Sequence, residues 1–197
     1  MIHYKNKYRV ESARLKGWDY SSNGGYYITI CVHNRECVFG NIEDRKMIMS
    51  DLGKIAEKYW LEIPHHFPFV KLDTYVVMPN HIHGIIFIEK NINHEKSVVE
   101  STESVETQDL ASLQSNKKNG SECNFGPQSK NIASIIRGFK IGVKKYAVNN
   151  NIPFKWQPRF YDHIIRDDND LNRIRKYLTD NPLNWKNGEN SLSETIP

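Results

Sequence analysis

The chain has 197 residues, with 27 Lys and Arg against 23 Asp and Glu and a formal net charge of +4. Its 39% of hydrophobic residues suffices for one core and excludes a wholly disordered chain. The longest apolar stretches are far shorter than the ~20 residues of a membrane span, and the first ten residues hold no apolar signal core. Three cysteines without a C-x-x-C pair favour reduced thiols, so we expect a cytoplasmic protein.

The charge is uneven along the chain. Residues 94–130 hold six acidic and four basic residues, so the remainder has 23 basic and 17 acidic residues, a net +6. A basic body with an acidic segment suits a polyanionic partner. Ordinary solubility charge is the alternative explanation.

The first part of the chain predicts an arm, a strand and a hairpin. Residues 1–24 are basic and aromatic without clear periodicity, which indicates an N-terminal arm. The β-branched and aromatic run Tyr26–Val32 predicts a strand. Val38–Ile42 and Lys46–Met49 then predict the two strands of a small hairpin.

A helix and two strands are predicted next. The Ser50 hydroxyl can cap a helix that Pro64 ends. The apolar residues of its buried face are spaced three or four apart: Leu52, Ile55, Ala56 and Tyr59. Val70–Met78 and His81–Ile88 read as strands on either side of a break, and we expect them to pair antiparallel.

Residues 91–130 contain too few apolar side chains for a core of their own, so we interpret them as a flexible insertion. A helical stripe of apolar residues follows: Ile132, Ile135, Ile136, Phe139, Val143 and Tyr146. Phe160–Ile165 predicts a further strand. Asp167 or Asp168 can cap a last helix, which stops at Pro182.

This order of elements predicts an α+β domain, an antiparallel sheet of four or five strands flanked by helices. The predicted organisation is an arm over 1–24, one domain over 25–182 with an insertion at about 91–130, and a C-terminal tail over 183–197.

The first candidate constellation is His81-Ile82-His83. Side chains alternate on a strand, so both imidazoles face one side while Ile82 enters the core. Two neutral imidazoles side by side can chelate a divalent ion. Two unrelated histidines at a strand entrance are the alternative.

The second constellation is Tyr177 with Asn181, which share a helical face at i and i+4. Their alternative roles are an edge-packing aromatic and a capping Asn ahead of Pro182.

Basic and aromatic residues form two further groups. Arg137, Lys140, Lys144 and Lys145 lie on one side of the helix after the insertion, as nucleic-acid contacts or as a solvated surface. The segment 156–163 mixes aromatics with Arg159, which suits stacking on unpaired bases and equally suits packing. His163 within it is a third metal ligand, a general base or a structural hydrogen-bonding group; we favour the last.

Taken together, six segments in chain order resemble the single-tyrosine HUH transposases, and within them the REP-associated tyrosine transposases. HUH denotes His–hydrophobic–His, here His81-Ile82-His83. The segments are RLKGWDY (Arg14–Tyr20), YYITICVHNRECVFG (Tyr26–Gly40), VVMPNHIHGII (Val76–Ile86), IIRGFK (Ile135–Lys140), WQPRFYDHIIR (Trp156–Arg166) and LNRIRKYLTDNPLNW (Leu171–Trp185).

The resemblance implies a ferredoxin-like HUH nuclease fold and a transposase-like endonuclease that forms a 5′-phosphotyrosine. It implies that Tyr177 is the nucleophile and that His81, His83 and Asn181 hold Mg²⁺ or Mn²⁺. The implied substrate is single-stranded or hairpin DNA. The implied protein is a monomer or homodimer in the bacterial cytoplasm, associated with the nucleoid when it binds DNA. The basic residues that we expect to contact DNA are Arg14, Lys16, Arg137, Lys140, Lys144 and Arg159.

Two other functions compete with this one. A domesticated protein would bind hairpin DNA without cutting it. A metal-dependent phosphoesterase would use His81 and His83 with activated water, and would form no covalent link through Tyr177.

Overall fold

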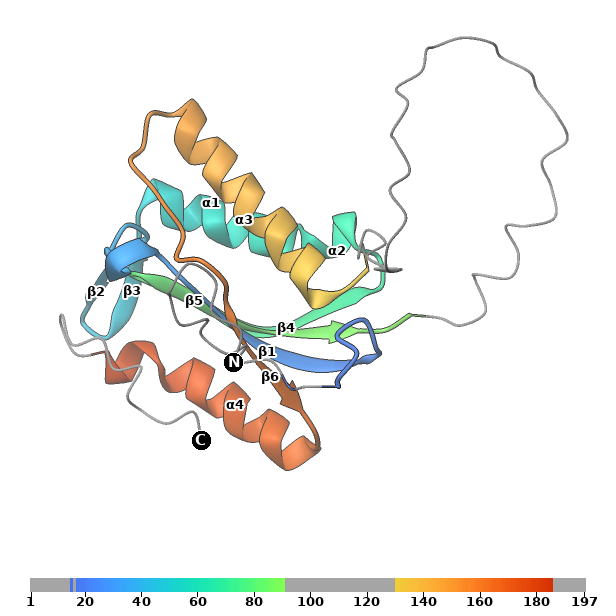
Figure 1. Cartoon of the computed structure of the whole chain (residues 1–197). Helices are drawn as coiled ribbons and strands as arrows, with labels where there is room; N and C mark the ends of the chain where they lie inside the picture. Colours follow the sequence, from blue (N-terminus) through green and yellow to red (C-terminus); the bar gives the residue numbers. More distant parts are fainter. Residues whose placement is uncertain (1–14, 16, 91–129, 186–197) are drawn as a thin grey trace, which may run out of the picture. The chain divides into compact units, whose positions relative to one another are not determined.

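The computed structural model describes residue 15 and residues 17–90 and 130–185 (Figure 1). The elements, in chain order, are β1 (Gly24–Cys31), η1 (His33–Arg35), β2 (Gly40–Glu43), β3 (Lys46–Met49), α1 (Asp51–Leu61), α2 (Ile63–His66), β4 (Val70–Met78), β5 (His81–Ile88), α3 (Ile132–Asn149), β6 (Tyr161–Ile165), α4 (Asp168–Asp180) and η3 (Pro182–Asn184). No helix in the described ranges is long and apolar enough to cross a membrane.

A four-stranded antiparallel sheet organises the domain, with strand order β4-β5-β1-β6. The hairpin β2-β3 forms a separate two-stranded sheet. The predicted α+β class and the antiparallel sheet of four or five strands are therefore confirmed. β1 and β5 are the central strands, so the histidines of β5 have sheet neighbours on both sides, and β4 and β6 form the two edges.

Helices cover both faces of this sheet (Figure 1). α1 and α3 lie on one face and α4 lies on the other. Side chains alternate along β1, so the strand contributes to the apolar packing on both faces of the sheet. Tyr26 and Ile28 belong to the core under α1 and α3, whereas Tyr27 belongs to the cluster under α4. Among the described residues, 21 buried side chains form the first core and four form the second. The bulk of the apolar burial therefore lies on the α1–α3 side.

Each of the three long helices begins at a residue whose side chain caps its first turn. Ser50 accepts a hydrogen bond from the Gly53 backbone N–H at 3.1 Å and caps α1, as predicted. Asn131 caps α3 through a reciprocal capping box with Ser134. Asp167 caps α4, which decides between the two aspartates that the sequence offered.

Several helices and strands begin or end at residues other than the predicted ones. The prediction that Pro64 ends the first helix is wrong: α1 stops at Leu61, and Pro64 lies in the first turn of α2, where its missing N–H costs no hydrogen bond. β1 starts two residues early, β2 starts at Gly40, and β6 starts at Tyr161. The predicted insertion, apart from residue 130, and most of the predicted arm and tail lie outside the described residues.

Candidate active site

The histidine pair opens β5 on the face that α4 covers. The rings of His81 and His83 lie with their centroids 4.4 Å apart and their planes at 71°. Ile82 between them is fully buried in the opposite core. The predicted alternation is therefore confirmed.

Asn80 fixes the orientation of the His81 ring. The Asn80 amide nitrogen donates to the Arg35 carbonyl at 3.1 Å, so its Oδ1 faces His81 Nδ1 at 2.6 Å. Because Oδ1 only accepts, His81 must carry its proton on Nδ1 and leave a lone pair on Nε2. Burial lowers the pKa of His81 to about 3, which keeps this imidazole neutral at neutral pH.

Two hydroxyls of β1 hold His83. The Tyr27 hydroxyl and Thr29 Oγ1 each lie 2.8 Å from His83 Nδ1. Antiparallel pairing places Thr29 directly opposite His83, so this contact comes from the sheet register. Burial lowers the pKa of His83 well below its ordinary value, so it too is a neutral imidazole. With Nδ1 engaged, Nε2 of His83 is the nitrogen that remains for a ligand.

Tyr177 lies against this pair within the same chain. Its ring centroid is 5.7 Å from that of His83 and 6.4 Å from that of Tyr27, both edge to face. Ile174 and Leu178 on the same helix are fully buried and seat α4 on the sheet, while Tyr177 is half-buried. The pKa of Tyr27 is raised, first by burial, and the neighbouring Tyr177 and Tyr161 add to this. The Tyr177 ring therefore lies next to the histidine pair.

The segment after Tyr177 continues past His81. Asn181 is the C-cap of α4 and keeps helical backbone angles (φ −58°, ψ −46°) although Pro182 follows it. Among the described residues, its side chain makes no hydrogen bond to either histidine. The Trp185 ring, just beyond η3, lies 6.0 Å from the His81 ring. The role of Asn181 as a ligand stays a prediction.

Four site residues were missed by sequence reasoning: Tyr27, Thr29, Asn80 and Trp185. Tyr27 and Thr29 reach His83 through strand pairing between distant segments, for which a single sequence carries no spacing signal. Asn80 had an available signal, because it directly precedes the histidine pair. His163 bonds Asp170 on α4 at 2.8 Å, in agreement with the structural role favoured above.

The donor set suits a divalent ion. Within the described ranges no group of three or more His, Cys, Asp or Glu gathers. The two neutral imidazoles are candidate ligands, and the Asn181 amide as a third stays a prediction. Neutral imidazoles suit transition ions such as Mn²⁺, and amide and phosphate oxygens suit Mg²⁺ and Mn²⁺ alike. Because these ligands are neutral, they would not cancel the positive charge of a bound ion, which could then attract an anionic substrate.

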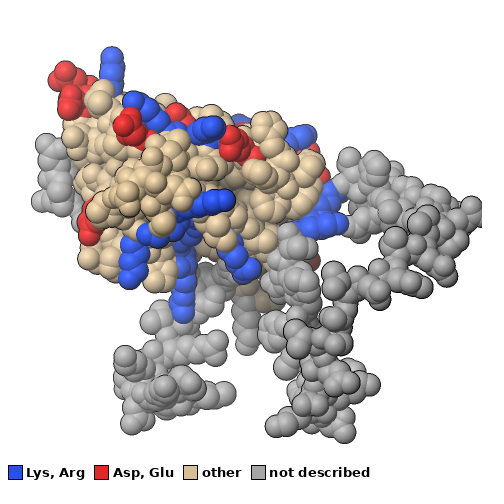
Figure 2. Space-filling view, turned by 90° about the horizontal axis from the view of Figure 1, so that it is seen from above, with Lys and Arg blue, Asp and Glu red and all other residues tan. Residues whose placement is uncertain are grey.

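The predicted basic residues that the structure describes lie on the α1–α3 side of the sheet: Arg137, Lys140, Lys144 and Arg159. Arg14 and Lys16 fall outside the described residues. A cavity of about 710 Å³ runs along the outer side of α3, and its lining includes Arg137, Arg159 and Trp156. Figure 2 looks onto the face that carries α1 and α3, and Lys and Arg side chains gather along one margin of it with few Asp or Glu among them.

Two of the predicted basic residues, Lys140 and Lys144, also donate hydrogen bonds to backbone carbonyls of the chain. Lys140 Nζ donates to the carbonyls of Gln157 at 2.9 Å and Arg159 at 2.5 Å, and Lys144 Nζ donates to the Phe154 carbonyl. Burial lowers the pKa of Lys140 to about 8. Lys140 and Lys144 therefore fasten the 154–159 segment to α3, a role that the helical periodicity did not indicate.

Comparison with known proteins identifies relatives. No protein-family model matches the chain. It is 38% identical over 176 residues to an "Uncharacterized protein" of Haemophilus influenzae, covering 89% of each chain. It is 23% identical over 165 residues to a "Putative REP-associated tyrosine transposase" of the same organism, covering 84% of this chain and 73% of that one.

A solved structure shares the fold. It is a REP-associated tyrosine transposase bound to a REP hairpin, with a TM-score of 0.53 and 16% sequence identity. The match covers 86% of this chain and 73% of that chain. The antiparallel sheet with helices on both faces is thus the fold of a tyrosine transposase.

Proposed function

We propose that this chain, which belongs to the same family as the uncharacterised Haemophilus influenzae protein and resembles the REP-associated tyrosine transposases in sequence and fold, cuts and rejoins single-stranded or hairpin DNA. The observation that carries the proposal is the position of Tyr177 beside His83 and His81 in one chain. A phenol next to two neutral, oriented imidazoles joins a nucleophile to a cation site, which is what phosphotyrosine chemistry requires.

The protein groups prepare the site before any substrate binds. Asn80 holds His81, and Tyr27 with Thr29 holds His83, so Nδ1 of each ring is engaged and Nε2 of each is left for a ligand. When bound, Mg²⁺ or Mn²⁺ held by His81, His83 and Asn181 would supply positive charge that polarises a phosphoryl oxygen.

Tyr177 carries the covalent step. Its hydroxyl oxygen attacks the scissile phosphorus, the P–O3′ bond breaks, and the DNA leaves with a free 3′-hydroxyl while its 5′-phosphate stays on the tyrosine. Since a free tyrosine has a pKa of about 10, the phenol proton must leave during the attack. In the reverse step a 3′-hydroxyl attacks this phosphorus and releases the phenol, so the phosphodiester energy is conserved without a nucleotide cofactor.

DNA contacts are proposed for the basic residues. Arg137 and Arg159 line the α3 cavity beside Trp156 and Phe160, a mixture of cations and aromatics that suits phosphates and unpaired bases. Lys140 and Lys144 add charge there, and Arg14 and Lys16 complete the proposed set. The proposed place of action is the bacterial cytoplasm, at the nucleoid when DNA is bound, by a monomer or homodimer.

The test is covalent capture of DNA. Wild-type protein incubated with Mg²⁺ or Mn²⁺ and a hairpin oligonucleotide with single-stranded flanks, drawn from the inverted repeats beside its gene, should yield a protein–DNA adduct. Tyr177→Phe should abolish the adduct. Tyr161→Phe is the matched control, because Tyr161 also packs on Tyr27, with ring centroids 6.3 Å apart, and should form it normally.

His81→Ala and His83→Ala should reduce cleavage far more than hairpin binding. Adduct formation by Tyr177→Phe at the wild-type rate would contradict the proposal. Hairpin binding with no adduct under either metal would point instead to a domesticated binding protein.

A further inference from the structure

α4, the helix that carries Tyr177, packs on the smaller of the two apolar clusters of the domain. Ile174 and Leu178 are its fully buried residues, and they share a cluster with the buried Tyr27 and Ile85. Partly buried hydrophobic side chains pack against this cluster: Val76, Phe87, Tyr161, Ile165, Leu171 and Tyr177. The hydrophobic effect is not directional, so apolar contact alone resists sliding and rotation of a helix less than hydrogen bonds of fixed geometry do. Directional contacts therefore contribute to the orientation of α4.

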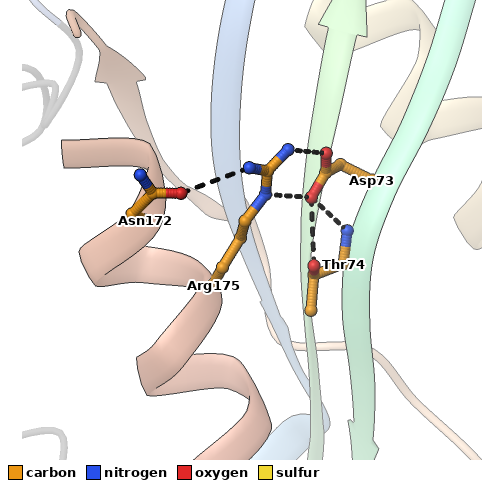
Figure 3. A network of polar contacts seen from close by, with 4 residues as sticks. All are labelled: Asp73, Thr74, Asn172 and Arg175. Carbon is orange, nitrogen blue, oxygen red and sulfur yellow. Dashed lines mark hydrogen bonds and ion pairs between the residues drawn. The ribbon is translucent and has the colours of Figure 1, made fainter. Parts of the chain in front are cut away.

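The strongest such contact lies at the β4 edge of the sheet (Figure 3). Arg175 donates from Nε to Asp73 Oδ1 at 2.9 Å and from Nη2 to Asp73 Oδ2 at 2.6 Å. This paired geometry suits a guanidinium and a carboxylate, and it defines direction as well as distance. Asn172, one turn earlier on α4, accepts a hydrogen bond from Nη1 of the same Arg175 at 3.3 Å.

Asp73 is itself fixed by an irregularity in β4. The pairing with β5 shifts register between Leu72 and Tyr75, so Asp73 and Thr74 lie in a bulge. There the Thr74 backbone N–H and hydroxyl donate to Asp73 Oδ1 at 2.6 and 3.0 Å. The hydrogen bonds from Arg175, and then those from Thr74, hold the pKa of Asp73 at about 2, so this carboxylate is charged at neutral pH.

A second polar contact holds α4 at the opposite edge. His163 of β6 bonds Asp170 at 2.8 Å, near the start of the helix, and Arg173 bonds the other oxygen of Asp170 at 2.5 Å. β4 and β6 are the two edges of the four-stranded sheet. α4 is thus fastened at both edges, and Tyr177 lies over the central strands between them.

We propose that Asp73 and Arg175 form a positioning pair that sets the rotation of α4 and so presents Tyr177 to the histidines of its own chain. The inference rests on the proposed function, because it assigns the pair a role in the tyrosine's reaction. Arg175 and Tyr177 are two residues apart, so they leave the helix on different sides. Arg175 bonds the edge strand, while Tyr177 packs over the central strands. A rotation of the helix about its axis that breaks the Arg175 contact therefore also displaces Tyr177.

The expected effect is large on rate and small on binding. A displacement of about 1 Å at a reacting group can lower a rate by about 100-fold. Arg175→Ala should therefore slow adduct formation by about 10- to 100-fold at saturating hairpin DNA, with the DNA dissociation constant changed less than about threefold. Lys176→Ala is the matched control: it removes one exposed positive charge from the neighbouring position of α4 and should leave the rate unchanged.

Two further variants separate positioning from charge. Asp73→Asn should slow the reaction as Arg175→Ala does, and the double variant should be no slower than either single one, because both remove the same contact. Arg175→Lys keeps the charge but cannot form the paired geometry, so it should recover only part of the rate.

Hydrogen exchange of the full chain without DNA tests the pair independently of catalysis. Arg175→Ala should speed amide exchange in α4 at least about threefold and leave α3 unchanged, whereas Lys176→Ala should change neither. Unchanged exchange in α4, or equal losses of binding and rate, would overturn the positioning role. A wild-type chain that forms no adduct would refute the proposed function instead, and the exchange result would still decide whether the pair holds α4.

Discussion

The two hydroxyls on His83 Nδ1 allow a quantitative test of the site. Tyr27→Phe removes one 2.8 Å contact and leaves Thr29 as a partner for the buried nitrogen. We expect this change to cost about 1 kcal/mol of unfolding free energy, and Thr29→Val about the same. The double variant leaves Nδ1 of His83 buried without either hydroxyl partner, which adds about 1–3 kcal/mol. The total loss is then about 3–5 kcal/mol, against about 2 kcal/mol for independent sites.

Urea unfolding followed by tryptophan fluorescence measures all three free energies. The control pairs Tyr26→Phe with Thr29→Val, because Tyr26 belongs to the core on the opposite face and its hydroxyl bonds the Ser22 carbonyl and Trp18 instead. That pair should be additive within about 0.5 kcal/mol. If Tyr27→Phe and Thr29→Val are also additive, the two hydroxyls do not share one imidazole nitrogen, and the reasoning about His83 fails.

Three other outcomes follow from the structure. Gly84→Ala should cost about 1–3 kcal/mol in urea unfolding, because the added Cβ would lie 2.3 Å from the fully buried Trp60 ring. Asp73→Asn should lower the melting temperature by a constant amount above about pH 5. Since the native carboxyl has its pKa lowered to about 2, this difference should shrink as the pH falls and be mostly lost by about pH 2, and an undiminished difference there would contradict it. Arg137→Ala should reduce the slope of log affinity against log salt for single-stranded DNA by roughly 0.7, and an unchanged slope would remove Arg137 from the DNA contacts.

Local patterns predicted the elements well, because their causes lie within a few residues. The alternation around Ile82 placed both histidines on one face, and Ser50 capped α1 through its own hydroxyl. Pro64 was misread because a proline is compatible both with the end of one helix and with the first turn of the next. Only the chain path between α1 and α2 distinguishes the two.

The support of the site could not be predicted, because it depends on pairing between distant segments. Thr29 meets His83 through sheet register, and Arg175 meets Asp73 across 102 residues and through a bulge. Lys140 and Lys144 have the spacing of a free basic face, yet the returning 154–159 segment supplies carbonyls to both. Each of these contacts follows from tertiary structure rather than from local spacing.

Peptide mapping of the protein–DNA adduct tests the central claim most directly. The chain has 10 tyrosines, and several of them pack near the histidine pair. After nuclease and protease digestion, mass spectrometry should find the residual nucleotide on the peptide that contains Tyr177, joined through a 5′-phosphate. A nucleotide on any other residue, or a 3′-phosphate linkage, would contradict the account.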